Sequence, residues 1–288
     1  MPTDATATLL VACPDREGVI AAVATALAEA NRNILDADQH ADPVDGRFFM
    51  RVAFQASATE TDDQRAELAA RIDRVATQLA MTTRLRWPAV RRRMAILCSK
   101  QTHCVADLLW RHSIGELDAD VTRVISNHAD AEPLADGFGH NYERLPITPE
   151  TKLEQEARIV ELLEADATDL VVLARYMQVL SPALVDRFAG RIINIHHSFL
   201  PAFAGAKPYH QAFEKGVKLI GATAHYVTAD LDEGPIIAQQ TRHVTHRDTV
   251  EDLVRKGRDL ERVTLAEAVR LHLEDRVIVD GAKTIVFE

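Results

Sequence analysis

The sequence predicts an α/β protein of two domains. Its 288 residues are enough for two hydrophobic cores of ordinary size. Two patterns follow each other along the chain: first four strands with two helices between them, then strands and helices in alternation. Trp87-Pro88 and the run of arginines at 91–93 separate the two patterns. We therefore predict a first domain over residues 1–86, a linker over 87–93 and a second domain over 94–288.

The first domain is predicted to have the order β-α-β-β-α-β. An apolar run forms the first strand, and Cys13 to Gly18 break it before a helical pattern begins. The turn at 42–46 joins the next two strands into a hairpin. The predicted strands are 5–12, 34–40, 47–55 and 83–87, and the predicted helices are 19–30 and 62–79. This order is that of a split, ferredoxin-like unit.

The second domain is predicted to contain a mostly parallel sheet, because its strands alternate with helices. Ser181 and Pro182 are typical of the cap and the first turn of a helix, and Thr151 is a second expected cap. The predicted strands are 94–98, 121–126, 170–173 and 192–196, and the predicted helices are 105–112, 151–164 and 182–188. Functional sites of such sheets gather at the carboxyl ends of the strands.

Composition excludes several classes of protein. The formal net charge of −10 argues against a broad nucleic-acid footprint. No apolar run approaches the roughly 20 residues of a membrane span, and the first residues lack a signal pattern, so we expect a cytoplasmic protein without a membrane partner. Cys13, Cys98 and Cys104 have no paired metal spacing and are odd in number, which predicts buried or incidental thiols.

An amide and an imidazole stand two residues apart at the end of an apolar run. Because side chains alternate along a strand, Asn194 and His196 are expected to point to the same side of strand 192–196. A later turn carries the carboxylates of Asp230, Asp232 and Glu233, and spacing alone does not decide whether Asp230 or Asp232 faces the site. Such a set can attack a carbonyl without a covalent nucleophile.

These histidines have two competing explanations. A lone histidine near an apolar strand is more often structural than catalytic, although an asparagine two residues earlier makes that explanation weaker. A metal hydrolase would take its ligands from His196, His197, His225 and Asp232. No His-Glu-x-x-His sequence supports that class, so the sequence predicts no metal site.

Residues 194–201 with Gly205, and residues 221–239, resemble the formyltransferase family that handles 10-formyltetrahydrofolate. The resemblance covers about residues 94–280 and implies a Rossmann-like formyltransferase domain. It also implies a catalytic trio of Asn194, His196 and Asp232. Residues 173–181 match the segment that lines the folate pocket in this family. The implied substrate-binding residues are Arg175, Tyr176, Met177, Val179, Leu180, His225 and Val227.

Three departures from the transferases of that family favour hydrolysis. Residues 99–103 lack the glycine-rich loop that holds the phosphate of glycinamide ribonucleotide. The chain ends soon after its last helix, without the nucleic-acid-binding domain of methionyl-tRNA formyltransferases. His197 stands where the transferases usually have proline.

With its first domain, the chain resembles the formyltetrahydrofolate deformylase branch. That implies a hydrolase of a linear amide C–N bond, which splits 10-formyltetrahydrofolate with water and needs no cofactor. Its products would be formate for purine biosynthesis and tetrahydrofolate, so that the one-carbon folate pools stay balanced. Transfer of the formyl group to an amine is the alternative.

The first domain resembles the ACT family of small regulatory domains. Asp15, Arg16, Gly18 and Asn33 stand at the positions that surround an amino-acid site in that family. The resemblance implies an effector such as glycine or methionine and a homo-oligomer, either a dimer or a tetramer. A third class of function would be a sensor that binds folate without turnover, and the intact trio argues against it.

Overall fold

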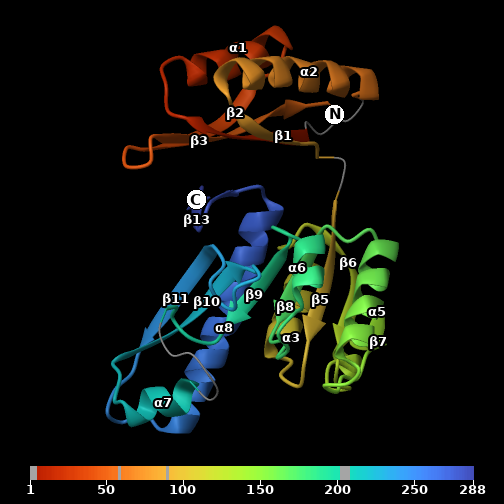
Figure 1. The fold of residues 1–288 in the computed structure, drawn as a ribbon, viewed down its shortest axis with the longest axis vertical. Helices are drawn as coiled ribbons and strands as arrows, with labels where there is room; N and C mark the ends of the chain where they lie inside the picture. Colours follow the sequence, from red (N-terminus) through yellow and green to blue (C-terminus); the bar gives the residue numbers. More distant parts are fainter. Residues whose placement is uncertain (1–4, 58–59, 89–90, 202–207) are drawn as a thin grey trace. The chain divides into compact units, whose positions relative to one another are not determined.

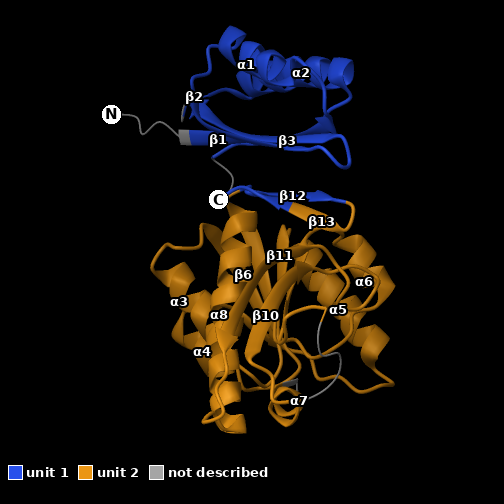
Figure 2. Cartoon of the chain, turned by 90° about the vertical axis from the view of Figure 1, so that its left-hand side faces the viewer, with its two compact units in different colours: residues 1–91, 275–280, 285–288 blue, residues 92–274, 281–284 orange. Residues whose placement is uncertain are grey.

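A computed structural model describes residues 5–57, 60–88, 91–201 and 208–288. It contains two compact units, which Figure 2 shows in different colours. The first unit consists of Met1–Arg91 with Asp275–Asp280 and Ile285–Glu288, and the second of Arg92–Glu274 with Gly281–Thr284. The last residues of the chain, which the sequence analysis assigned to the second domain, therefore group with the first unit.

The first unit has the predicted β-α-β-β-α-β order. Its sheet has the strand order β2-β3-β1-β4, with β3 antiparallel to both β1 and β2. The strands are β1 (Ala5–Pro14), β2 (Ile34–Asp42), β3 (Arg47–Ala56) and β4 (Thr82–Arg86). Two helices, α1 (Val19–Glu29) and α2 (Asp62–Leu79), cover one face of this sheet (Figure 1). The ferredoxin-like prediction is confirmed.

Local sequence explains how α2 begins and which face it buries. Thr61 and Gln64 form a capping box, in which each side chain satisfies a free backbone N–H group of the other. Leu68, Ile72 and Ala76 recur every four residues and are buried. This stripe joins the apolar residues of β1 and β3 in one core.

The C-terminal residues contribute a second apolar cluster to the first unit. Phe287 is buried with Leu10 of β1 and Phe49 of β3. Phe287 directly follows β13 (Lys283–Val286), which pairs with β12 (Val277–Asp280) in a short hairpin. Burial of these apolar side chains explains why the end of the chain departs from the predicted domain range.

The second unit contains a seven-stranded sheet, ordered β11-β10-β9-β8-β5-β6-β7. The five strands from β9 to β7 are parallel, while β10 is antiparallel to both β9 and β11. The strands are β5 (Arg92–Cys98), β6 (Ala119–Ser126), β7 (Tyr142–Arg144), β8 (Leu170–Ala174), β9 (Ile192–His196), β10 (Leu219–Tyr226) and β11 (Ile236–His243). The mostly parallel sheet is as predicted.

Helices cover both faces of this sheet. In Figure 2, α3 and α8 lie on one side and α5 and α6 on the other. The helices are α3 (His103–Ser113), α4 (Glu132–Gly137), α5 (Lys152–Ala165), α6 (Pro182–Arg187), α7 (Pro208–Glu214) and α8 (Val250–Leu273). Ser181 caps α6 as predicted, whereas the Thr151 side chain makes no capping hydrogen bond to α5.

Two further findings concern the cysteines and the helices. The thiols of Cys13, Cys98 and Cys104 are free and buried. Within the described ranges, no helix combines the length and the apolar character that crossing a membrane requires.

Candidate active site

Asn194 and His196 lie at the carboxyl end of β9, where the alternation of strands and helices predicted chemistry. Both residues line one cavity. In the antiparallel ladder between β9 and β10, Asn194 stands opposite His225. Directly opposed residues share a face of the sheet, so the register of these strands brings the two side chains together.

His225 orients the amide of Asn194. The imidazole is buried, and its Nδ1 lies 2.9 Å from the carbonyl oxygen of Tyr226. A carbonyl only accepts, so Nδ1 carries a proton, while Nε2 lies 3.7 Å from Oδ1 of Asp232. The Asn194 amide nitrogen lies 3.2 Å from this Nε2. This contact orients the Asn194 amide, a supporting role of His225 that the sequence analysis did not predict.

Asp232, and not Asp230, is the carboxylate that reaches the imidazole of β9. Its Oδ2 lies 3.2 Å from Nδ1 of His196, while Asp230 is exposed. Asp232 has a left-handed backbone with φ of 58°. A Cβ on Gly234 would lie 1.7 Å from the carbonyl oxygen of Tyr226, so this turn requires glycine there. The backbone of the turn decides which carboxylate faces inward.

The pair of Asp232 and His196 has a defined polarity. Hydrogen bonds from His196 and then from His225 hold the pKa of Asp232 well below its usual range, so the carboxylate is ionised. An ionised carboxylate only accepts, and Nδ1 of His196 is therefore the donor. The other ring nitrogen, Nε2, is buried without a hydrogen-bond partner among the described residues. This nitrogen is the hydrogen-bonding group that the site leaves available for a ligand.

His197, the departure from the transferase pattern, packs beside His196. The two rings are stacked with centroids 5.0 Å apart. Burial, together with the nearby charge of Arg175 and the neighbouring His196, lowers the pKa of His197 to about 4. His197 is therefore neutral near pH 7.

The cavity has a volume of about 250 Å³ and apolar walls. It contains the predicted catalytic trio together with all seven predicted substrate-binding residues. Those seven are Arg175, Tyr176, Met177, Val179, Leu180, His225 and Val227. Met177 and Val179 are each 55% exposed, so apolar side chains stand open at the cavity. Gly205, which belongs to the formyltransferase resemblance, lies outside the described residues.

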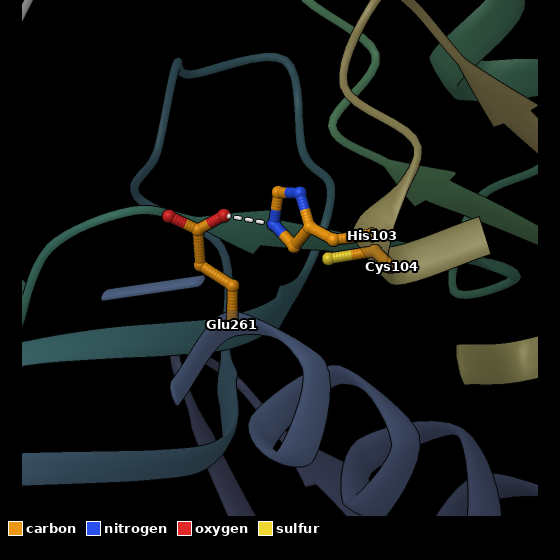
Figure 3. Close-up of side chains that lie close together, drawn as sticks. All are labelled: His103, Cys104 and Glu261. Carbon is orange, nitrogen blue, oxygen red and sulfur yellow. Dashed lines mark hydrogen bonds and ion pairs between the residues drawn. The ribbon is translucent and has the colours of Figure 1, made fainter. Parts of the chain in front are cut away.

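A second group of polar residues, which the sequence analysis did not find, is buried around Glu261 of α8. Its carboxylate lies 2.7 Å from Nε2 of His103 (Figure 3). It also accepts a hydrogen bond of 2.7 Å from the Tyr209 hydroxyl. Nε of Arg175 lies 3.4 Å from the same oxygen that faces His103. Glu261 occupies a buried stripe of α8 with Gly257, Thr264 and Ala268. A glutamate within an otherwise uncharged, buried stripe of a helix is the pattern in the sequence that could have indicated this buried polar group.

His103, Cys104 and Glu261 also have the donor types of a metal site. Their ligand atoms lie within 4.8 Å of one another (Figure 3). The guanidinium of Arg175 stands beside the same carboxylate, and burial raises the pKa of the Cys104 thiol well above its usual value. A cation and a protonated thiol both disfavour a bound metal ion.

Comparison with known proteins places the chain in a family. A family model described as formyl transferase matches residues 92–269, and an ACT domain model matches residues 7–70. A formyltetrahydrofolate deformylase from Synechocystis is 51% identical over 282 residues, which is 98% of each chain. The chain belongs to the formyltetrahydrofolate deformylase family.

Solved structures separate the deformylase family from the transferases. The crystal structure of a formyltetrahydrofolate deformylase from Pseudomonas syringae is 45% identical, with a TM-score of 0.93 over 98% of this chain and 94% of the other. A glycinamide ribonucleotide transformylase from Symbiobacterium toebii is 36% identical, with a TM-score of 0.64 over 69% of this chain and 95% of its own. The similarity to the deformylase thus includes both domains.

The four residues predicted for an amino-acid site do not come together within one chain of this deformylase-family protein. Asp15, Arg16 and Gly18 follow β1, whose last residue pairs with Arg47 of β3. Asn33 precedes β2, whose first residue pairs with Phe54 of β3. Seven residues of extended strand separate those partners, which is about 23 Å. A free amino acid is too small to touch both ends of the sheet.

Proposed function

We propose that this protein hydrolyses 10-formyltetrahydrofolate to formate and tetrahydrofolate. The relatives named formyltetrahydrofolate deformylase support the reaction, and the cavity beside β9 supplies suitable groups. One observation carries the mechanism. His196 is held at Nδ1 by an ionised carboxylate, while its Nε2 is left without a partner among the described residues.

In this mechanism His196 is the general base. Asp232 accepts a hydrogen bond from the Nδ1–H of His196, so the neutral ring has its lone pair at Nε2. Nε2 takes a proton from water as the water oxygen bonds to the formyl carbon. The Asn194 amide, which His225 orients, donates an N–H to the oxyanion that forms.

Collapse of the tetrahedral adduct completes the reaction. The proton on Nε2 passes to N10 of the folate as the C–N10 bond breaks. The formic acid formed in the cavity loses its proton there and leaves as formate, so that one water is consumed and one proton is set free. The open apolar wall that includes Met177 and Val179 receives the pterin ring in this proposal. Water is the only co-reactant, and no cofactor enters.

Incubation of the purified protein with 10-formyltetrahydrofolate alone tests the reaction. Formate and tetrahydrofolate should accumulate in equal amounts without any amine. The control is the Asn194→Ala variant, whose turnover should be roughly 10²–10³-fold lower because one oxyanion donor is lost. Products that appear only after glycinamide ribonucleotide is added would support formyl transfer instead. Activity that disappears on chelation and returns with a metal ion would contradict the metal-free mechanism.

Regulation by an amino acid is a further part of the proposal. Asp15, Arg16 and Gly18 lie at the opposite end of the sheet from Asn33, so a site that uses all four takes them from two copies of the chain. This favours a homo-oligomer, a dimer or a tetramer, with glycine or methionine as effector. Sedimentation and turnover, each measured with and without these amino acids, test the assembly and the effector together. The cytoplasmic location stays a prediction.

A further inference from the structure

Arg175 is held in an unusual backbone conformation at the active cavity. It directly follows β8 and lines the same cavity as His196 and His197. Its φ is 63°, in the left-handed region that residues with a Cβ rarely adopt. Its side chain is only 9% exposed. A strained backbone that delivers a buried cation to a reaction site is typical of a functional position.

The guanidinium of Arg175 has more donors than acceptors around it. Nε stands 3.4 Å from Glu261, but neither Nε nor Nη1 makes a hydrogen bond among the described residues. Glu261 already receives the Tyr209 hydroxyl and lies against His103. Buried donors without acceptors are costly, and an arginine fork matches a carboxylate geometrically. The cavity therefore favours a small anion beside Arg175.

The proposed reaction generates such an anion. The formyl group of the substrate is neutral, whereas the product formate is a carboxylate. Formation of the C–O bond and loss of the C–N10 bond give formic acid, and loss of its proton inside the cavity leaves a negative carboxylate. A fixed cation has little charge to attract before the reaction and a full negative charge afterwards.

We propose that Arg175 is the binding site for the formate product, with Glu261 as the residue that positions its guanidinium. The inference rests on the proposed function and adds a ligand class, a small monocarboxylate, to that cavity. Arg175 complements the charge that develops late in the reaction. Formate therefore binds to the ligand-free protein as well, independently of turnover.

The test is binding of ¹³C-labelled formate to the full-length protein, measured by NMR line broadening at constant ionic strength. The variant is Arg175→Gly, because glycine accepts the left-handed backbone without strain. The matched control is Arg158→Gln on α5, an exposed arginine paired with Glu161. Wild type and the control should bind formate equally, and Arg175→Gly should bind at least about tenfold more weakly.

Several outcomes would overturn the proposal. They are equal formate binding by Arg175→Gly and wild type, no binding by wild type, or displacement of formate by chloride as readily as by unlabelled formate. If Arg175→Gly does not fold, a wild-type crystal soaked in formate decides by whether the carboxylate lies on Arg175 or elsewhere. Wild type that binds formate through Arg175 but does not deformylate would retain this site while the proposed function fails. Wild type that deformylates while Arg175→Gly keeps its formate affinity would refute this inference alone.

Discussion

The pair of His196 with Asp232 and the pair of His103 with Glu261, both in the second unit, differ in how completely they are bonded. His196 and Asp232 are 3.2 Å apart, with the Asp232 side chain 28% exposed. His103 and Glu261 are 2.7 Å apart, with the Glu261 side chain 1% exposed. Glu261 is also bonded by Tyr209 and faces Arg175, whereas the first pair leaves Nε2 of His196 without a partner among the described residues.

In the proposed mechanism, this contrast separates a reactive pair from a structural one. A buried polar group stabilises the fold when all its hydrogen-bonding atoms have partners. It is available to a substrate when one such atom has none. His196, which lines the cavity, has such an atom in Nε2. Both carboxylate oxygens of Glu261 already have partners. In our proposal Glu261 acts by positioning Arg175, which lines the cavity. Four substitutions, in decreasing order of expected effect, test this division.

The largest effect is expected from Asp232→Asn. The amide cannot accept as an anion and no longer fixes the tautomer of His196, so turnover should fall roughly 10³–10⁴-fold. The measurement is the initial rate of formate release at saturating substrate. Asp230→Asn, on the exposed neighbour, should have near-normal turnover. A large loss in Asp230→Asn with little in Asp232→Asn would assign catalysis to the other carboxylate.

Glu261→Gln should mainly lower stability. It removes the charge that faces the buried guanidinium of Arg175, which is expected to cost about 3–5 kcal/mol in the free energy of unfolding. Urea denaturation measures this. Glu267→Gln, which breaks a half-exposed pair with Arg270 on the same helix, should cost less than about 1 kcal/mol. Equal stabilities of the two variants would show that the buried group is not structural.

His197→Gln should reduce the acid sensitivity of folding. The pKa of His197 is about 4 in the folded chain against an ordinary value of 6.5, so the unfolded state binds the proton more readily. Stability is therefore lost as pH falls from 6.5 towards about 4. The variant should lose about 2 kcal/mol less than wild type between about pH 7 and about pH 4.5.

Some charges near His197 lower its pKa and others raise it. A second histidine variant serves as the control for the substitution. Arg175 and His196 lower the pKa of His197, while Glu261 and Asp232 raise it and only partly offset burial. His246→Gln, at an exposed position, should leave the pH dependence of the unfolding free energy unchanged. Parallel curves for wild type and His197→Gln would contradict the assignment.

The smallest effect is expected from Tyr209→Phe. The phenyl ring keeps its packing against Gly257, where an added Cβ would lie 2.0 Å from the ring, and only the donor to Glu261 is lost. The free energy of unfolding should fall by about 1.5 kcal/mol. Turnover should stay near normal. A loss of turnover as large as that of Asp232→Asn would show that the pair of His103 and Glu261 takes part in catalysis.

Much of the fold follows from local patterns in the sequence. The alternation of strands and helices, the Ser181-Pro182 cap and the β-α-β-β-α-β order all depend on neighbouring residues, and the structure confirms them. The C-terminal hairpin was not predicted to join the first unit. Its apolar residues complete a surface of β1 and β3 that lies more than 200 residues away in the chain, as the contact of Phe287 with Leu10 shows.

The sequence by itself determined which residue types meet at the end of β9, because Asn194 and His196 lie two apart on one strand. It left open which carboxylate joins them and what supports them. Only the tertiary structure selected Asp232, through the left-handed turn before Gly234, and gathered His103, Arg175, Tyr209 and Glu261 from distant segments. The physical reason is range. Strand periodicity acts over a few residues, whereas the completion of hydrogen bonds depends on which segments the fold brings within about 3 Å.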